Sequence, residues 1–518
     1  MNNFFQPKAS LTHHEAAQAA QQEAQTLPKP SNNNTRPQRI LNLLSHIPTF
    51  LFRFLRLVTF VLVLLPAFCV FLWHYLTCDR VAVYYGPCCC DNADTESNNG
   101  ACCGASSHDK RNTKSRCTVC SPFFSRHYLD IYGSNTTTDN SNTDNNIQSK
   151  KPVILFLTGG AYIIGYKMWG TLLARALSPH VLVIVPDYRN YPRVNVHGMV
   201  HDIDTSIDWV LNNVEEFGGD ASKVVLVGQS AGAHLGGVCV VRKVLDRIRR
   251  LRLNKDSLST ADEDAASAAD GHDAPFKTSY EATDLCGFIS TSSPHNLVTM
   301  KQVFHRHGLS CSVQRSIFGG SEVDGTDASG QDVFEKWSTF HLAKRCHDEY
   351  ASLVEGRETE VLNAGVELSL KDLFPNLCII HGTNDKTVPV EESIEFLSLL
   401  SNLQIPTQQR FYEGWTHTDP ILEAPMRGIH LYHKDVYDLV RLWTNPLKSY
   451  TDESEHKCDD GRGCCNHWTE KGSNDSGSKG YGSVSDACTL PDLDDQDPML
   501  RPICPRPLVE IARICNPF

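Results

Sequence analysis

A serine between two closely spaced glycines, in the string GQSAG at residues 228–232, constrains the fold more than any other feature. The apolar run VVLV at residues 224–227 predicts a buried strand directly before it, and a helix is expected from Ala231 onward. The glycines allow a sharp turn between the two elements. This turn would place the Ser230 hydroxyl at the strand end, beside the positively polarised N-terminus of the helix. The alternative is a Gly-rich turn that serves only as a connection.

Short apolar runs alternate with helical patterns along the body of the chain. Besides the strand before Ser230, the runs that predict strands lie at residues 153–157, 181–185, 285–289, 377–380 and 408–412. Helical spacing covers residues 200–216, 391–400 and 436–443. This alternation indicates a mostly parallel sheet with helices on both faces. A strand, a turn with a central serine and a helix within such a sheet predict the α/β-hydrolase fold over residues 151–446.

The remaining segments of the 518-residue chain differ from this body in composition. Two lie within the body: an acidic, exposed insert at residues 254–284 and a lid over the site at residues 294–374. Residues 77–150 are expected to be a Cys-rich linker of low order. Both ends are polar, so we expect a disordered tail at residues 1–46 and a mostly disordered tail at residues 449–518, of which residues 508–518 could dock as a short helix.

Residues 57–76 contain no Asp, Glu, Lys or Arg. Twenty apolar residues in a helix span roughly 30 Å, the thickness of a bilayer core, which predicts a single transmembrane helix. A signal peptide would start earlier and have a shorter apolar run, and a buried helix of a soluble protein is the other alternative. Arginines precede the segment, which favours a cytosolic N-terminus and a lumenal body, although basic residues at 110–116 weaken this orientation. We expect a single-pass protein of the endoplasmic reticulum or Golgi membrane.

The 20 cysteines are unevenly placed, and nine of them lie between Cys69 and Cys120. They could form disulfides in a lumen or carry palmitoyl groups beside a membrane in the cytosol. A zinc site at Cys117 and Cys120 would need a second ligand pair at a suitable spacing, and none follows. The net charge of −12 argues against a nucleic-acid partner, whose binding surface would be basic.

A serine nucleophile needs a base and a group that orients the base, and in this fold they follow in the order Ser, Asp or Glu, His. Asp385 follows the predicted strand at 377–380, and His417 follows the last predicted strand. We therefore expect Ser230, Asp385 and His417 to form a catalytic triad. Asp348 and Asp419 are alternative acids, and His381, at the strand end, is expected to hydrogen-bond locally.

A glycine pair after the first predicted strand completes the expected site. Gly159 and Gly160 follow that strand about seventy residues before Ser230, where this fold carries a loop that donates to an oxyanion hole. The second donor would be the N–H of Ala231. A plain turn is the alternative for the loop. Residues 187–189, after the second strand, are expected to brace these loops.

Three strings of the chain resemble plant-type isoprenylcysteine methylesterases: TGGAYIIGYK at 158–167, GQSAGAH at 228–234 and YEGWTHTD at 412–419. The resemblance covers about residues 152–446, and the membrane segment ahead of the body is also similar. It implies hydrolysis of the carboxyl methyl ester of a farnesyl- or geranylgeranyl-cysteine, with Ser230, Asp385 and His417 as the triad. It also implies an oxyanion hole at Gly159, Gly160 and Ala231. The acidic insert, the long linker and the extended tail depart from the family.

The expected reaction uses an acyl-enzyme and needs no metal or organic cofactor. Its partners would be a prenylated cysteine methyl ester or prenylated protein, and the membrane. Two alternatives remain open: another carboxylesterase, lipase or arylformamidase on the same fold, or a hydrolase fold kept as an interaction module. The second alternative predicts loss of triad members, and all three are present in the sequence.

Overall fold

The structure of the chain is a computed structural model that describes residues 62, 65, 68–86, 126–134, 150–259, 278–321, 325–328, 330–355, 369–445, 502 and 505–515. The contacts divide the chain into two units, and the one from Leu65 to Val509 contains the sheet. The sheet and the site described below lie in that unit, whereas residue 62 and the part of α13 (Arg506–Cys515) from Glu510 onward belong to the other. The predicted disordered segment 1–46 lies outside the described residues, as do residues 87–125 and 135–149 of the predicted linker and residues 449–501 of the predicted tail.

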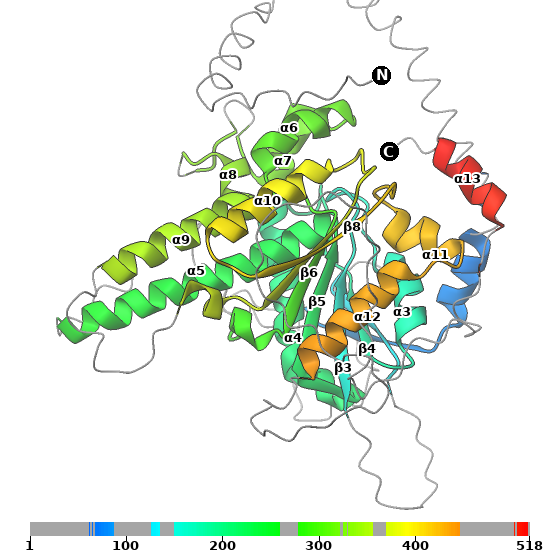
Figure 1. Cartoon of the computed structure of the whole chain (residues 1–518), viewed down its shortest axis with the longest axis horizontal. Coiled ribbons are helices and arrows are strands. Elements are labelled where there is room, and N and C mark those ends of the chain that lie inside the picture. The colour runs from blue at the N-terminus through cyan, green and yellow to red at the C-terminus, as the bar shows by residue number, and fades with distance from the viewer. Residues whose placement is uncertain are drawn as a thin grey trace, which may run out of the picture. The chain divides into compact units, whose positions relative to one another are not determined.

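A single eight-stranded sheet forms the centre of the unit, in the order β1-β2-β4-β3-β5-β6-β7-β8 (Figure 1). β3 to β8 are parallel to one another, and β1 and β2 add an antiparallel edge. The strands are β1 (Arg80–Tyr84), β2 (Tyr128–Tyr132), β3 (Lys151–Leu157), β4 (Leu182–Pro186), β5 (Gly219–Gln229), β6 (Gly287–Thr291), β7 (Asn376–Gly382) and β8 (Thr407–Tyr412). The predicted mostly parallel α/β sheet is therefore confirmed.

The prediction of one low-order linker over residues 77–150 is wrong at its two ends. β1 and β2 lie within that range and pair with each other, and β2 pairs in turn with β4. β1 is only half buried, so its sequence, RVAVY, lacks the continuous apolar run that marks a central strand. The sheet consequently begins about seventy residues before the predicted start of the domain.

Helices cover both faces of the sheet because successive strand residues point to opposite sides. In β3, Val153, Leu155 and Leu157 pack into one core with α4 and α5, whereas Ile154 and Phe156 pack into the other with α3 and α12. The helices of the body before the insert are η2 (Lys167–Gly170), α3 (Thr171–Leu177), α4 (Val196–Asn213), η3 (Val214–Phe217) and α5 (Ala231–Ser259). Those after the lid are α10 (Val390–Asn402), η8 (Asp419–Glu423), α11 (Ala424–Met426), α12 (Leu431–Thr444) and α13 (Arg506–Cys515).

The two predicted insertions have helical structure where the chain is described. The acidic insert was expected to be a loop from residue 254, but α5 continues to Ser259, and η5 (Ala282–Asp284) occupies its end. The predicted lid contains α6 (Leu297–Arg306), α7 (Cys311–Phe318), α8 (Val333–Trp337), α9 (Thr339–Glu355) and η7 (Leu370–Leu373). In Figure 1, α6, α7 and α8 lie together beyond one end of the sheet.

The predicted transmembrane segment falls largely outside the described residues. Of residues 57–76, the structure describes 62, 65 and 68–76, all helical, and the helix continues to residue 77. Within the described part of the chain, no helix has the length and apolar character needed to cross a bilayer.

Candidate active site

Ser230 lies at a tight turn between β5 and α5. Its φ angle is +54°, a left-handed conformation that is rare for residues other than glycine. Its backbone N–H donates to the carbonyl oxygen of Thr291 at 2.8 Å, which ties the turn to the end of β6. A Cβ on Gly232 would lie 2.4 Å from the carbonyl oxygen of Leu157, so only glycine lets α5 pack this closely on β3. Such strained turns are often found at functional sites.

The structure brings Ser230, His417 and Asp385 together in one hydrogen-bonded chain. The Ser230 Oγ lies 2.8 Å from His417 Nε2, and His417 Nδ1 lies 2.7 Å from Asp385 Oδ2. Asp385 follows β7 and His417 follows β8, so both come from loops at the carboxyl edge of the parallel strands. The side chain of His417 is 12% exposed and that of Asp385 is fully buried. The serine hydroxyl can therefore donate to an imidazole whose other nitrogen faces a carboxylate.

Asp385 is held as a carboxylate in spite of its burial. Burial by itself would raise its pKa, but the charge of His417 and hydrogen bonds from His381 and His417 outweigh it and hold the pKa of Asp385 below its usual range. Its other oxygen, Oδ1, accepts from the backbone N–H groups of Thr387 and Val388, both at 2.9 Å. The carboxylate thus keeps a fixed orientation and a negative charge toward His417.

His381 is a second histidine on this carboxylate, a role that its position at a strand end did not indicate. It makes the expected local hydrogen bonds: Nε2 lies 2.9 Å from the Val388 carbonyl oxygen and Nδ1 lies 2.7 Å from Ser393 Oγ. Because a carbonyl oxygen only accepts, Nε2 carries a hydrogen, and it also lies 3.3 Å from Asp385 Oδ2. The spacing H-x-x-x-D, which crosses from a strand end to its loop, is the signal that could have found this contact.

Removing this second donor should weaken catalysis without abolishing it. We expect His381→Leu to lower kcat for ester hydrolysis roughly 10- to 100-fold, since a hydrogen bond to a charged group contributes about 1.5–3 kcal/mol. His381→Gln retains an N–H donor and should recover part of the loss. Steady-state kinetics of both variants checks this, with thermal unfolding measured in parallel. Equal losses in the two variants would show that His381 acts only through packing.

The loop after β3 brings its backbone against the serine. A Cβ on Gly159 would lie 2.9 Å from Ser230 Cβ and 2.2 Å from Gln229 Oε1, so the loop can approach this closely only with glycine there. Gly160 has a φ of +136°, and Ala161 and Tyr162 also have positive φ angles. Of the predicted oxyanion-hole residues, Gly159 therefore lies against the Ser230 turn. Gly160 follows Gly159 in the same loop, and Ala231 is the residue directly after Ser230.

Hydrogen bonds from neighbouring segments hold this loop in place, as expected for Asp187 and Tyr188, whereas the Arg189 side chain binds Asp202. The Tyr188 hydroxyl donates to the Thr158 carbonyl oxygen at 2.8 Å, and the Asn190 side chain donates to the Gly165 carbonyl oxygen at 2.8 Å. Arg126 binds both the Asp187 carboxylate and the Gly165 carbonyl oxygen. Arg126 lies in the predicted linker, where no sequence pattern marked it as part of the site.

Tyr162 joins the same loop to the helix that follows Ser230. Its hydroxyl lies 3.1 Å from His234 Nδ1, while His234 Nε2 lies 2.8 Å from the Trp337 carbonyl oxygen at the end of α8. Burial lowers the pKa of His234 to about 4, so this histidine is neutral at pH 7. Nε2 must carry its hydrogen to donate to the carbonyl, and Nδ1 then accepts from Tyr162.

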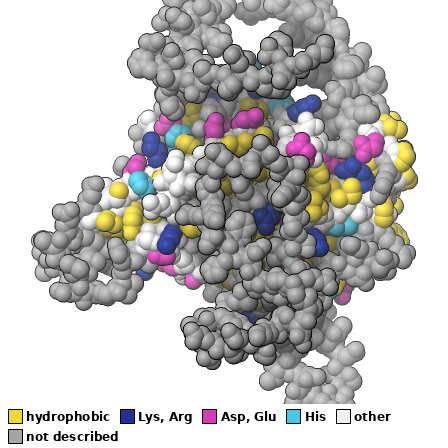
Figure 2. Space-filling model, viewed as in Figure 1, with side chains coloured by type: hydrophobic (Ala, Val, Ile, Leu, Met, Phe, Trp, Pro, Cys, Tyr) yellow, Lys and Arg dark blue, Asp and Glu magenta, His cyan; other side chains and the backbone are white. Residues whose placement is uncertain are grey.

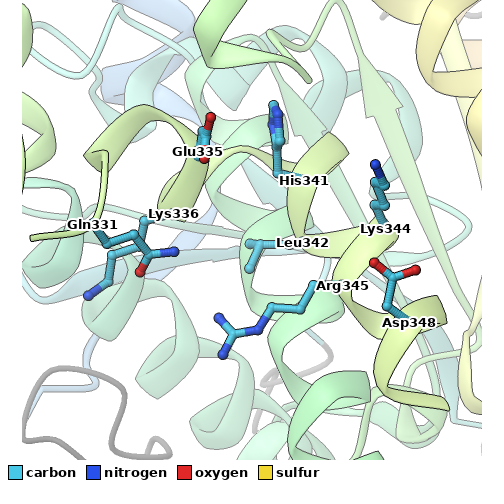
Figure 3. Close-up of a pocket in the computed structure, with 8 residues that line it drawn as sticks. All are labelled: Gln331, Glu335, Lys336, His341, Leu342, Lys344, Arg345 and Asp348. Atoms are coloured by element: carbon cyan, nitrogen blue, oxygen red, sulfur yellow. The ribbon is translucent and has the colours of Figure 1, made fainter. Parts of the chain in front are cut away.

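The two alternative acids lie elsewhere. Asp419 Oδ2 accepts from the Thr416 N–H at 2.8 Å and Oδ1 accepts from Arg427 at 2.9 Å, so Asp419 organises the loop after β8. Asp348 lies on α9 at a polar cleft of about 220 Å³ in the predicted lid (Figure 3). This cleft is lined by Gln331, Glu335, Lys336, His341, Leu342, Lys344, Arg345 and Asp348, and Ser230, Asp385 and His417 are not among these residues.

Comparison with known proteins confirms the resemblance that the sequence strings indicate. Over 312 residues the chain is 30% identical to the isoprenylcysteine alpha-carbonyl methylesterase ICME of Arabidopsis thaliana, covering 58% of this chain and 56% of that protein. Over 279 residues it is 32% identical to the probable isoprenylcysteine alpha-carbonyl methylesterase ICMEL1 of Oryza sativa subsp. japonica, covering 54% and 53%. The chain thus spans about half the length of the curated relatives it matches.

The sequence profile of one family and several solved structures also match. Residues 142–326 match the BD-FAE family, an α/β-hydrolase family. Among solved structures, the apo form of Thermogutta terrifontis esterase 2 has 20% identity and a TM-score of 0.35, covering 61% of this chain and 87% of that one.

Proposed function

We propose that this chain is a serine carboxylic ester hydrolase in which Ser230 is the nucleophile, His417 the general base and Asp385 the group that orients it. The observation that carries the proposal is the hydrogen-bonded chain from Ser230 through His417 to Asp385. The names of the curated relatives, which are methylesterases, support the same reaction class.

In this mechanism Ser230 attacks the ester carbonyl while His417 Nε2 takes its proton. Asp385 stabilises the imidazolium that forms and keeps the hydrogen of His417 on Nδ1. The backbone N–H groups of the Gly159–Gly160 loop and of Ala231 stabilise the oxyanion, and each such donor contributes about 3 kcal/mol in a well-formed hole. His417 then protonates the leaving alcohol, and water attacks the acyl-enzyme by the same route. No metal or organic cofactor takes part in these steps.

We further propose that the substrate is the carboxyl methyl ester of a farnesyl- or geranylgeranyl-cysteine, free or on a protein. Two observations support this choice: the string at residues 158–167 and the names of the curated relatives, which are methylesterases of isoprenylcysteine. Such a substrate partitions into membranes. Residues 68–76 of the predicted membrane helix pack on the body through Phe71 and Tyr75. We propose that the uncharged residues 57–67 before them attach the chain to the membrane beside this substrate, in the endoplasmic reticulum or Golgi, without a nucleic-acid partner.

The test is methanol release by the full-length chain in detergent from farnesylcysteine methyl ester, with p-nitrophenyl acetate and N-formylkynurenine as comparison substrates. We expect kcat/KM for the farnesyl ester to be at least about 100-fold higher than for the acetate, since each buried CH₂ contributes roughly 0.8 kcal/mol. Turnover of the acetate alone would indicate a carboxylesterase with another substrate. Preference for N-formylkynurenine would indicate an arylformamidase. If none of the three substrates is hydrolysed, the proposed reaction class is wrong.

A further inference from the structure

The helix at residues 68–77 packs on the body through one side and exposes apolar side chains on the other. Phe71 and Tyr75, one turn apart, are 0% and 7% exposed. Trp73 and Leu76 are 66% and 64% exposed. A surface helix of a soluble protein normally turns polar side chains outward. Figure 2 shows hydrophobic side chains at the right of the view, where Figure 1 draws this segment in blue.

The helix begins at the edge of the sheet that carries the candidate active site. The Phe71 ring stacks on Trp169 of η2, the element that follows the loop of Gly159 and Gly160, with centroids 6.3 Å apart. One turn later, the Tyr75 hydroxyl donates to Asp130 at 3.2 Å, and Asp130 is paired with Val185, near the carboxyl end of β4. The chain then enters β1 at its amino end. The uncharged segment before residue 68 is therefore attached at the active-site edge.

The loop itself continues the apolar surface of the helix. Ile164 is 66% exposed and Tyr166 is 39% exposed. Asp130 connects loop and helix, because it pairs with Lys167 at 2.6 Å while it accepts from the Tyr75 hydroxyl at 3.2 Å. Helix 68–77 and residues 164–166 thus form one surface, which we call the apolar lip.

Lipid is the occupant that fits this surface. The lip is continuous in sequence with residues 57–67, which contain no acidic or basic residue. Trp73 and Tyr166 are of the two types that concentrate at the boundary between headgroups and acyl chains. The position of the loop is fixed by Arg126, Asn190 and Lys167, so its exposed isoleucine is presented on a rigid support.

We propose that the apolar lip, with Trp73, Leu76 and Ile164 at its centre, sits in the headgroup–acyl boundary of a lipid bilayer. The lip would enter the boundary by roughly 5–10 Å, as amphipathic surface helices do. The candidate active site then opens at the membrane surface, and a lipophilic ester reaches Ser230 from the bilayer without crossing water. This inference rests on the proposed membrane-bound esterase and adds the surface through which it meets its substrate.

Tryptophan quenching by brominated lipid tests the contact directly. The full-length chain is reconstituted into dioleoylphosphatidylcholine vesicles with or without bromine on the acyl chains. Ile164→Trp adds a fluorophore to the lip. Leu442→Trp is the matched control, because Leu442 is 49% exposed on α12 next to Trp443, which contacts Gly287 at the amino end of β6, the opposite edge of the sheet.

We expect brominated vesicles to quench the emission added by Ile164→Trp and to leave that added by Leu442→Trp unchanged. Trp73→Phe should reduce the quenched part of the native emission, which keeps the test valid if Ile164→Trp folds poorly. Vesicle-bound protein in which the two added tryptophans are quenched equally, or not at all, would overturn the lip while leaving the anchor intact. If the protein hydrolyses the ester in detergent but does not float with vesicles, both the apolar lip and the membrane anchor are wrong. The proposed reaction would be unaffected by that result.

Discussion

Ser230→Ala is expected to lower kcat for ester hydrolysis by about 10⁶-fold, the size of loss seen when a triad serine is removed from a serine hydrolase. The reason is that the hydroxyl 2.8 Å from His417 Nε2 is the atom that bonds to the substrate carbonyl in the proposed mechanism. Binding should change little, because the loop of Gly159 and Gly160 is held by groups other than Ser230. A residual rate above the uncatalysed reaction is expected from the oxyanion hole.

The measurement is a time course of methanol release at substrate saturation, with Ser398→Ala as the matched control. Ser398 lies exposed on α10, and its hydroxyl bonds only to its own helix, at the Ile394 carbonyl oxygen. Both variants should unfold at the temperature of the unaltered chain. Activity of Ser230→Ala within tenfold of the unaltered chain would exclude Ser230 as the nucleophile, whatever the substrate.

Asp385→Asn is expected to lower kcat by about 10⁴-fold, as it does in a triad whose geometry is otherwise intact. The structure indicates which way the new amide would face. Oδ1 accepts from two backbone N–H groups, so the amide oxygen would stay there and the NH₂ group would face His417 Nδ1. His417 would then have to accept at Nδ1 and carry its hydrogen on Nε2, where it could no longer accept the serine proton.

Kinetics of Asp348→Asn provides the control for this substitution, because Asp348 is the alternative acid and its side chain is 64% exposed on α9. We expect that variant to match the unaltered chain. A large loss in Asp348→Asn together with full activity in Asp385→Asn would reverse the assignment of the acid. Measuring kcat against pH adds a second readout, since the asparagine variant should recover rate at high pH, where hydroxide can replace the base.

The central strands could be predicted because each is buried on both faces and so reads as an uninterrupted apolar run. β1 and β2 were missed because β1 is only half buried and the apolar residues of β2 are interrupted by Asp130. Strand ends were also predicted too short: β5 extends from Gly219 to Gln229, beyond the apolar run at 224–227, since its outer residues are polar and partly exposed. Helix α4 was placed within a few residues of its observed bounds, because its apolar spacing is regular.

The order of the site residues along the chain was predictable because the fold places each one after a particular strand. Ser230 follows β5, Asp385 follows β7 and His417 follows β8. The contacts that support them were not predictable, because they join segments far apart in sequence. Arg126 reaches Asp187 and the Gly165 carbonyl across 61 and 39 positions, and Lys167 reaches Asp130 across 37. A charged residue in a polar segment carries no local pattern that distinguishes such a partner from a solvated side chain.

The pairing of Arg126 with Asp187 has a consequence for how far the chain can be truncated from its N-terminus. A fragment that begins at residue 150 would keep every residue proposed to take part in the reaction. It would lose the guanidinium that holds the loop carbonyl of Gly165 and the strand that borders β4, and it would leave the Asp187 carboxylate buried without that arginine. Removing one partner of a buried pair costs about 3–5 kcal/mol. The described residues 80–84 and 126–132 are thus no detachable tether: they supply Arg126 and the outermost strands, β1 and β2, on one side of the sheet.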